Sequence, residues 1–199
     1  MSQNQFDQIM EFNKFLLKFQ QIKRDLYVTG EDRMENDAEH SYQLTMMAWF
    51  INSIFKLNFN LDLLMRYALV HDLVEVWAGD TSVFNSSSKM LKDKKQREQK
   101  AFKIITKQFS HFPELTEYIN LYSTQQDQES LFIYSLDKLL PALNIYFDNG
   151  RSWKEHNITL ERWLIVQKAK ICKDRTMEIV LKSFLELITN KNELFEVTE

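Results

Sequence analysis

The stretch 70-VHDLVEVWAGDT-81 places a histidine and two acids within an apolar segment, and then breaks at Ala78-Gly79-Asp80. The apolar residues around His71 are typical of a buried helix, where unpaired charged or polar groups are destabilising by on the order of several kcal/mol. These side chains therefore require a partner. That partner is a salt bridge, a metal ion or the solvated end of a helix.

The composition favours a helical protein. The 199 residues include only three Gly and two Pro, whereas all-β folds need many turn residues. Hydrophobic residues make up 44% of the chain and aromatic residues 13%, which is typical of a globular protein with a sizeable core. We therefore predict an all-α fold in which residues 1–199 form a single domain, a bundle of about seven to nine helices.

The charge and the cysteine content restrict the partners and the compartment. A formal net charge of −3 provides no general attraction to nucleic acid or to anionic membranes. No apolar run reaches the roughly 18 residues of a membrane span, and the polar N-terminus lacks the features of a signal peptide. The single Cys172, interpreted as a small buried hydrophobe, excludes an internal disulfide framework. These features predict a cytoplasmic protein without a nucleic-acid or membrane partner.

Apolar residues recur at helical spacing in several segments. The periodicity predicts helices at residues 5–24, 38–57, 61–77, 89–109, 113–121 and 128–147, followed by one or two more between 159 and 190. Asp37 and Asn60 are the predicted N-caps of the second and third helices, and Gly79 is the predicted end of the third. Loops or turns are predicted at residues 25–37, 81–89 and 148–157.

Two histidines and two acids are candidates for a metal site. His71 and Asp72 are adjacent, so their directions on a helix diverge by about 100°, yet both side chains can reach an ion that lies between those directions. Glu75 shares a helix face with His71. His40 lies in the first turn of its own helix, and Asp137 is an acid within the apolar run 133-IYSLDKLLPAL-143. Asp137 would close the cage around such an ion.

The residues alone leave a metal site and ordinary buried ion pairs open. Lys138 directly follows Asp137, but side chains at i and i+1 on a helix do not face each other, which weakens a local ion pair. Two imidazoles and two carboxylates suit a divalent ion such as Mn²⁺, Co²⁺, Fe²⁺, Ni²⁺ or Zn²⁺. His111 and His156 lie beside predicted helix boundaries and are not expected to be ligands.

The pattern formed by His40, His71-Asp72 and Asp137 resembles the H…HD…D signature of the HD-domain phosphohydrolase superfamily. The strings 39-EHS-41, 71-HDLVE-75 and 79-GDT-81 resemble signatures of the bacterial 5′-deoxynucleotidases and their eukaryotic relatives. The resemblance covers roughly residues 10–145. It implies an all-α fold, one divalent metal at those four ligands and hydrolysis of a phosphate ester. The core motifs would lie within 24–145, with the helices at 159–190 packed on them.

The resemblance also implies roles for residues around the metal. Asp72 and Glu75 would be catalytic, with Glu75 beside the phosphate and the metal-bound water, and Asp80 would contact a sugar hydroxyl. Arg24 matches an arginine that approaches the substrate. The aromatic residue that usually follows this arginine is absent, and Arg33 is a second cation that would replace or assist Arg24.

The predicted function is a metal-dependent 5′-nucleotidase that removes phosphate from deoxynucleoside 5′-monophosphates by attack of a metal-bound water. One alternative is another HD phosphohydrolase that acts on a phosphodiester, a nucleoside triphosphate or a guanosine polyphosphate. A second alternative is a non-catalytic helical binding protein that is stabilised by metal. Members of the family commonly dimerise, so a homodimer is compatible with the resemblance.

Overall fold

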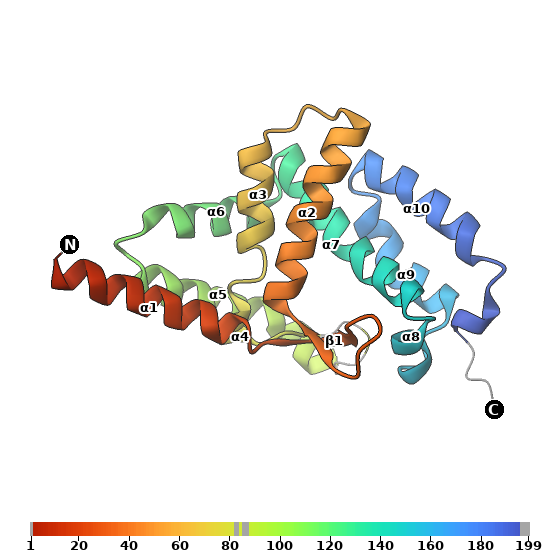
Figure 1. Ribbon diagram of the computed structural model, residues 1–199, viewed down its shortest axis with the longest axis horizontal. Coiled ribbons are helices and arrows are strands. Elements are labelled where there is room, and N and C mark those ends of the chain that lie inside the picture. Colours follow the sequence, from red (N-terminus) through yellow and green to blue (C-terminus); the bar gives the residue numbers. More distant parts are fainter. Residues whose placement is uncertain (1, 82–83, 85–87, 196–199) are drawn as a thin grey trace.

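Helices form almost all of the regular structure, as Figure 1 shows, which confirms the predicted all-α fold. The computed structural model describes residues 2–81, 84 and 88–195. The helices are α1 Gln3–Phe19, α2 Asp37–Phe55, α3 Leu61–Val70, α4 Glu75–Ala78, α5 Ser88–Gln108, α6 Pro113–Thr124, α7 Gln128–Phe147, α8 Arg151–Glu155, α9 Leu160–Ile171, α10 Arg175–Ile188 and the 3₁₀ helix η1 Asn192–Leu194. Two short strands, β1 Lys23–Tyr27 and β2 Met34–Asn36, complete the described elements.

The core consists of two clusters that meet along α3. The larger cluster lies between α2, α3, α7, α9 and α10, and its fully buried side chains include Leu44, Leu64 and Leu136. The smaller cluster lies between α1, the C-terminal end of α3, α5 and α6, and is centred on Phe15 and Phe109. Each fully buried side chain of this size stabilises the fold by roughly 1.5–3 kcal/mol. Helices α2, α3 and α7, which Figure 1 shows in the centre of the molecule, are thereby held as a rigid frame.

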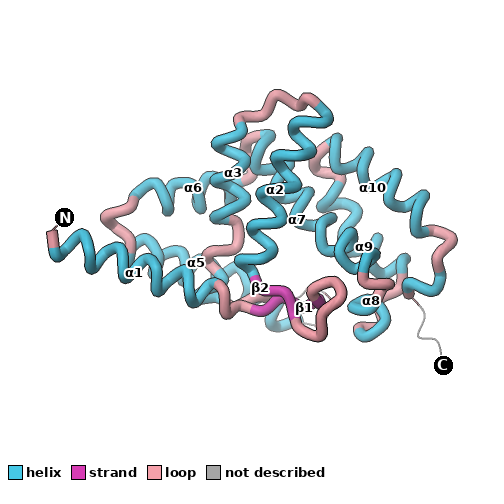
Figure 2. The backbone as a smooth tube through the Cα atoms, viewed as in Figure 1, coloured by secondary structure: helices cyan, strands magenta, loops and turns pink. Residues whose placement is uncertain are grey.

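An antiparallel hairpin of β1 and β2, magenta in Figure 2, occupies the segment for which a helix end and an exposed loop were predicted. The predicted first helix ends at Phe19 rather than at residue 24. Gly30 lies in the hairpin loop with φ +79°, a conformation that favours glycine. The strands are too short to show alternation, and a charged residue, Glu35, faces inward. Arg24 is consequently held on a strand.

The N-terminus of α2 differs from the prediction by one residue, with a consequence for the site. Asn36 is the N-cap and accepts hydrogen bonds from the backbone N–H groups of Ala38 (3.0 Å) and Glu39 (3.1 Å). The Glu39 side chain accepts from the Asn36 N–H at 3.1 Å, which completes a capping box. Asp37, the predicted cap, is the first helical residue and is fully buried. Its carboxylate is therefore available to groups inside the protein.

The predicted helix 61–77 is divided at the residues that carry the candidate ligands. Asn60 caps α3 as predicted, but α3 ends at Val70 and α4 begins only at Glu75. In the turn between them, the N–H of Glu75 donates to the Asp72 carbonyl at 2.8 Å. Gly79, with φ +74°, ends α4 and confirms the predicted termination. His71 is the C-cap of α3 and keeps helical backbone angles, so Asp72 is the first candidate ligand beyond the helix.

The remaining elements agree closely with the predicted segments. Helices α5, α6 and α7 correspond to the predicted 89–109, 113–121 and 128–147, and the segment 159–190 forms two helices. The short α8 lies within the predicted turn at 148–157. Most of the predicted loop at 81–89 lies outside the described residues. Among the described helices, none is long and apolar enough to cross a membrane. That residues 1–199 form a single domain remains a prediction.

The capping box yields a stability prediction. Asn36→Ala removes the acceptor for two backbone N–H groups and should lower the free energy of unfolding by about 1 kcal/mol. Asn36→Ser, which keeps a capping oxygen, should retain most of that stability. Urea unfolding followed by circular dichroism measures both variants. An Asn36→Ala variant as stable as the wild type would show that the cap does not anchor α2.

Candidate metal centre

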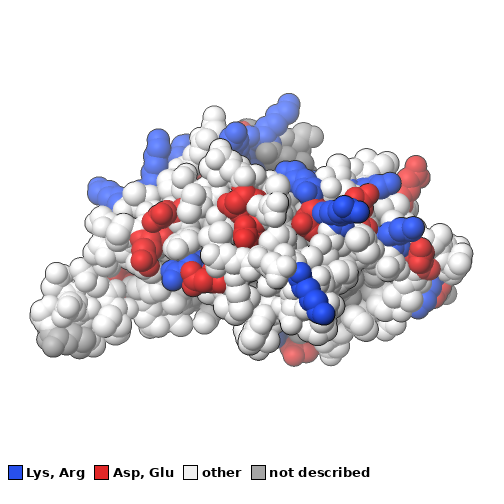
Figure 3. Space-filling view, turned by 90° about the horizontal axis from the view of Figure 1, so that it is seen from above, with Lys and Arg blue, Asp and Glu red and all other residues white. Residues whose placement is uncertain are grey.

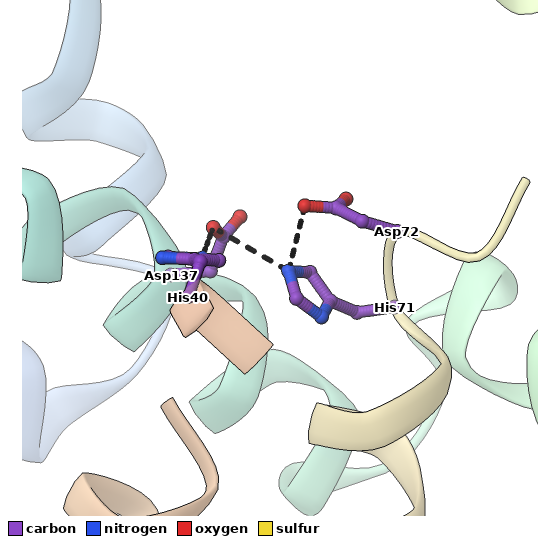
Figure 4. A group of neighbouring side chains, drawn as sticks. All are labelled: His40, His71, Asp72 and Asp137. Atoms are coloured by element: carbon purple, nitrogen blue, oxygen red, sulfur yellow. Dashed lines mark hydrogen bonds and ion pairs between the residues drawn. The ribbon is translucent and has the colours of Figure 1, made fainter. Parts of the chain in front are cut away.

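Three separate elements bring the four predicted ligands together. His40 comes from the first turn of α2, His71 and Asp72 from the turn after α3, and Asp137 from the middle of α7. Figure 4 shows the four side chains pointing toward one another. One nitrogen or carboxylate oxygen from each lies within 4.8 Å of all the others. The cluster therefore has the dimensions of a site for a single ion.

Both imidazoles direct Nε2 into the cluster and Nδ1 away from it. His71 Nδ1 donates to the Ala68 carbonyl at 2.9 Å, and its Nε2 lies 2.8 Å from Asp72 Oδ2. His40 Nε2 lies 3.0 Å from Asp137 Oδ1, while its Nδ1 faces Glu35 Oε2 at 3.6 Å. For His71, an outer acceptor that fixes the ring in this way is typical of histidines that bind metal.

The protonation states of the cluster suit a divalent cation. Burial, together with the nearby Arg24 charge, lowers the pKa of His40 to about 4 and keeps its ring neutral. Burial opposes ionisation of Asp72, but the adjacent His71 charge outweighs it and holds the carboxyl pKa well below its ordinary value. For Asp137, the effect of burial is outweighed mainly by Lys138, and the pKa is again well below the ordinary range. A neutral imidazole and ionised carboxylates are the forms that bind metal.

The buried polar atoms of the cluster are incompletely satisfied by the protein itself. Among the described residues, His71 Nε2 and His40 Nδ1 have no partner with hydrogen-bond geometry, although both are inaccessible to solvent. Such buried groups normally have a partner. A divalent ion would satisfy His71 Nε2 and the two carboxylates together. The residues present therefore fit a divalent metal, and the mixed nitrogen and oxygen donors suit a first-row transition ion.

Lys138 contacts Asp137 directly, so the argument against a local ion pair was wrong. Lys138 Nζ lies 2.5 Å from Asp137 Oδ2, whereas Oδ1 faces His40. The spacing rule compares the directions of two side chains at the helix surface, but a lysine stem is long enough to curl back to its neighbour. The two carboxylate oxygens have different partners. The ion pair and the metal-ligand position are consequently compatible.

Arg24 joins the hairpin to the cluster through three acids. Its Nε lies 3.2 Å from Glu35 Oε2, and its Nη1 lies 3.5 Å from Asp37 Oδ1 and 3.1 Å from Asp72 Oδ2. Neither Glu35 nor Asp37 was predicted to belong to the site. Burial, partly offset by Arg24, raises the pKa of Glu35 to about 7, and burial with the Asp72 charge raises that of Asp37 to about 8. Two acids spaced i, i+2 before a helix were the signal that could have revealed them.

Glu75 lies in a second group of acids beside the cluster. One carboxylate oxygen each of Asp37, Asp72 and Glu75 lies within 4.8 Å of the others. Burial, followed by the charges of Asp72 and Asp80, raises the pKa of Glu75 to about 11. Lys94 Nζ lies 3.7 Å from Glu75 Oε1, while Oε2 has no hydrogen-bond partner among the described residues. In the metal-free site, Glu75 therefore holds a proton.

A pocket opens beside the cluster and contains most of the predicted site residues. Arg24, Asp72, Glu75, Asp80 and Asp137 line it. Apolar side chains line it as well: Leu26, Phe84, Pro141, Ala142, Ile145, Trp153, Ile158 and Trp163. The pocket therefore combines charged side chains with aromatic and aliphatic ones.

Arg33 and His111 are not brought to this pocket. Arg33 is exposed and pairs with Glu31 (2.6 Å) and Glu39 (2.7 Å). His156, by contrast, lines the pocket and lies 3.1 Å from Asp25 Oδ1. His156 lies outside the cluster of four candidate ligands.

Comparison with known proteins gives the family. Residues 16–179 match the sequence model of the HD domain. The chain belongs to the HD-domain family. The human 5′-deoxynucleotidase HDDC2 is 29% identical over 133 residues, which cover 65% of this chain and 63% of the human protein. The zebrafish (Danio rerio) protein of the same name is 29% identical over 136 residues, 67% of this chain and 66% of that protein. The chain thus spans less than two thirds of the length of these relatives.

Two solved structures of HD-type proteins have the same fold. A predicted metal-dependent phosphohydrolase from Magnetospirillum magnetotacticum superposes with a TM-score of 0.79 at 24% identity, covering 95% of this chain and 96% of that one. An HD-domain phosphohydrolase from Listeria innocua superposes with a TM-score of 0.66 at 16% identity, covering 94% and 92%. The arrangement of helices around the cluster is therefore that of HD domains.

Removing one imidazole tests the cluster as a metal site. His71→Ala deletes a ligand whose Nε2 faces the cluster, so the purified variant should lose its stoichiometric divalent metal after dialysis against Mn²⁺ and gel filtration. His111→Ala, which removes an imidazole outside the cluster, should keep the wild-type metal content. Elemental analysis by mass spectrometry gives both values. Equal metal content in His71→Ala and the wild type would contradict the assignment.

Proposed function

We propose that the protein is a metal-dependent phosphoric ester hydrolase that removes phosphate from deoxynucleoside 5′-monophosphates. The observation that carries the proposal is a pocket lined both by Asp72 and Asp137 of the cluster and by aromatic and aliphatic side chains. Such a pocket suits a ligand with a phosphate at one end and a base at the other. The relatives named 5′-deoxynucleotidases support this substrate class.

His40, His71, Asp72 and Asp137 would hold one divalent ion. Mn²⁺, Co²⁺, Fe²⁺, Ni²⁺ and Zn²⁺ all accept this mixture of imidazole and carboxylate ligands. A divalent ion at such a site supplies activation of water and polarisation of a phosphoryl oxygen. Glu35 would act through His40 by orienting its ring, since its Oε2 faces His40 Nδ1 at 3.6 Å.

Glu75 would move a proton at the attacking water. Its carboxyl group lines the pocket and is protonated without metal because of burial and the neighbouring acids. The positive charge of a bound cation would lower that pKa toward the operating pH, where a group transfers protons most effectively. Arg24, which lies 3.1 Å from Asp72, would offset negative charge on the phosphate. Asp80, also in the pocket wall, would accept a hydrogen bond from a sugar hydroxyl.

A polyphosphate ester is the second candidate substrate. Three lysines, Lys94, Lys138 and Lys170, line the same pocket and add positive charge to its wall. A nucleoside triphosphate or a guanosine polyphosphate carries the additional negative charge that such lysines would bind. Activity toward these compounds and not toward monophosphates would favour this candidate.

A nucleotide screen tests the proposed function. With Mn²⁺ or Co²⁺ added, the protein should release phosphate from dAMP, dGMP, dCMP, dTMP or dUMP, because the cluster and pocket suit a phosphate monoester. Asp72→Ala should abolish release, whereas Asp62→Ala, an exposed acid on α3, should leave it unchanged. Malachite-green detection measures the phosphate released by the wild type and by the two variants.

Glu75→Gln separates proton transfer from metal binding in the same screen. It should retain the metal and lower kcat by about 10²–10⁴-fold, the usual contribution of a general acid or base. If the metal-loaded wild type released no phosphate from any of the five monophosphates, the proposed function would be wrong.

We also propose that the partner protein is a second copy of the chain, bound through the outer face of α2. Tyr42, Met46, Trp49, Phe50 and Ile54 are exposed on this helix, and residues 40–55 contain no Lys, Arg, Asp or Glu. An uncharged aromatic face of this kind marks an interaction surface. It is self-complementary, as a two-fold interface requires, because it places no charge against its own copy.

Substitution of this face tests the homodimer. Trp49→Glu or Phe50→Glu would introduce a charge into the interface and should convert a dimer into a monomer in light scattering coupled to size exclusion. Ile165→Glu, at an exposed isoleucine on α9, is the matched control and should remain dimeric. A wild-type protein that is monomeric at tens of micromolar, or a Trp49→Glu variant that stays dimeric, would contradict this proposal.

The proposed partners include neither nucleic acid nor membrane, and the proposed location is the cytoplasm. On the face shown in Figure 3, basic and acidic side chains are interspersed, in agreement with the net charge of −3. Nucleic-acid affinity depends on clustered Lys and Arg, which this arrangement does not favour. The single cysteine supports a reducing compartment.

A further inference from the structure

Three lysines from three different helices converge on the pocket. Lys94 belongs to α5, Lys138 to α7 and Lys170 to α9, and all three line the pocket wall. They are separated by more than thirty positions in the sequence, so their proximity is a product of the fold. Helices α7 and α9 are directly joined by a hydrogen bond from Ser135 Oγ to the Lys170 carbonyl at 3.3 Å.

The three amines differ in how their charge is compensated. Lys94 Nζ lies 3.7 Å from Glu75 and 3.6 Å from Glu98, and Lys138 Nζ lies 2.5 Å from Asp137. Lys170 Nζ donates only to the neutral Gln167 Oε1, at 3.3 Å, and forms no ion pair with any described residue. Within the part of the chain that the structure describes, this half-buried cation beside the pocket therefore lacks a negative partner within ion-pair distance.

The amines also repel one another across the pocket. Burial, followed by the charges of Lys138 and Lys94, lowers the pKa of Lys170 to about 8. Repulsion of this kind is relieved when an anion lies between the amines, since opposite charge favours the protonated form. All three amines line one pocket, so an anion bound there would reduce the repulsion among them.

Metal binding would strengthen this preference for an anion. The pocket wall contains five Asp or Glu side chains and four Lys or Arg side chains. A divalent cation adds two positive charges beside this wall, and it draws on Asp137, which is the partner of Lys138. The loaded pocket would attract an anionic ligand, because clefts lined by one sign of charge focus their field on the ligand.

We propose that Lys94, Lys138 and Lys170 form an anion-binding subsite that holds a phosphate group of the ligand, with Lys170 as its anchor. Each ammonium offers three donors to the phosphate oxygens, and Lys170 has no carboxylate that competes for them. The inference rests on the proposed function in taking phosphate as the anion. It goes beyond that function in naming three residues outside the metal ligands, and it predicts binding without turnover.

Calorimetric titration of inorganic phosphate into the full chain tests the subsite, both in EDTA and with Mn²⁺. The wild type should bind phosphate under both conditions, more tightly with the metal. Lys170→Met should weaken binding about tenfold, as expected for the loss of one charge-assisted contact. Lys170→Arg, which keeps the charge, should restore most of the affinity. Lys168→Met, an exposed lysine on the same helix, should bind like the wild type.

Two results would overturn the subsite. One is equal phosphate affinity in the wild type and in a folded Lys170→Met, and the other is no binding of millimolar phosphate by the wild type. The titration needs no nucleotide substrate. Its outcome is therefore independent of the outcome of the nucleotide screen. If phosphate binding depends on Lys170 but no nucleotide is hydrolysed, the anion-binding subsite is supported and the proposed substrate is contradicted.

Discussion

The carboxylate of Asp137 is the interaction on which the site depends. One oxygen lies 3.0 Å from His40 Nε2 on α2, and the other lies 2.5 Å from Lys138 Nζ. His71 Nε2 is 3.9 Å from the first oxygen, so the turn after α3 meets the same group. Asp137, His40 and His71 are buried and Lys138 is half-buried, and a buried charge persists only when it is paired. The helices therefore pack in the arrangement that pairs them.

The turn between α3 and α4 and the hairpin complete this arrangement. The turn carries Asp72 next to His71, whose ligand atoms lie in one cluster, and it places Glu75 at the start of the next helix. The hairpin carries Arg24 to Asp72, and its second strand carries Glu35 to His40. Backbone irregularities thus occur where the candidate chemistry requires side chains to converge, a common feature of functional sites.

The sequence predicted the residues of the site better than the backbone that holds them. His40, His71, Asp72 and Asp137 were predictable because ionisable residues within apolar runs need partners, and the HD-domain family is now established by its match. The hairpin was not predictable, since its strands of five and three residues are too short for periodicity and Glu35 faces inward. Nor was Lys170, because its position depends on the packing of α9 against α7. Arg33 shows the limit of reading charge alone, as its partners are surface acids.

The central claim is that these four side chains form one divalent-metal site. A crystal grown with Mn²⁺ and measured at two wavelengths, above and below the manganese absorption edge, tests this claim most directly. We expect one strong manganese-specific anomalous peak within coordination distance of His40 Nε2, His71 Nε2 and the carboxylates of Asp72 and Asp137. An absent peak, or a peak coordinated only by other residues, would contradict it.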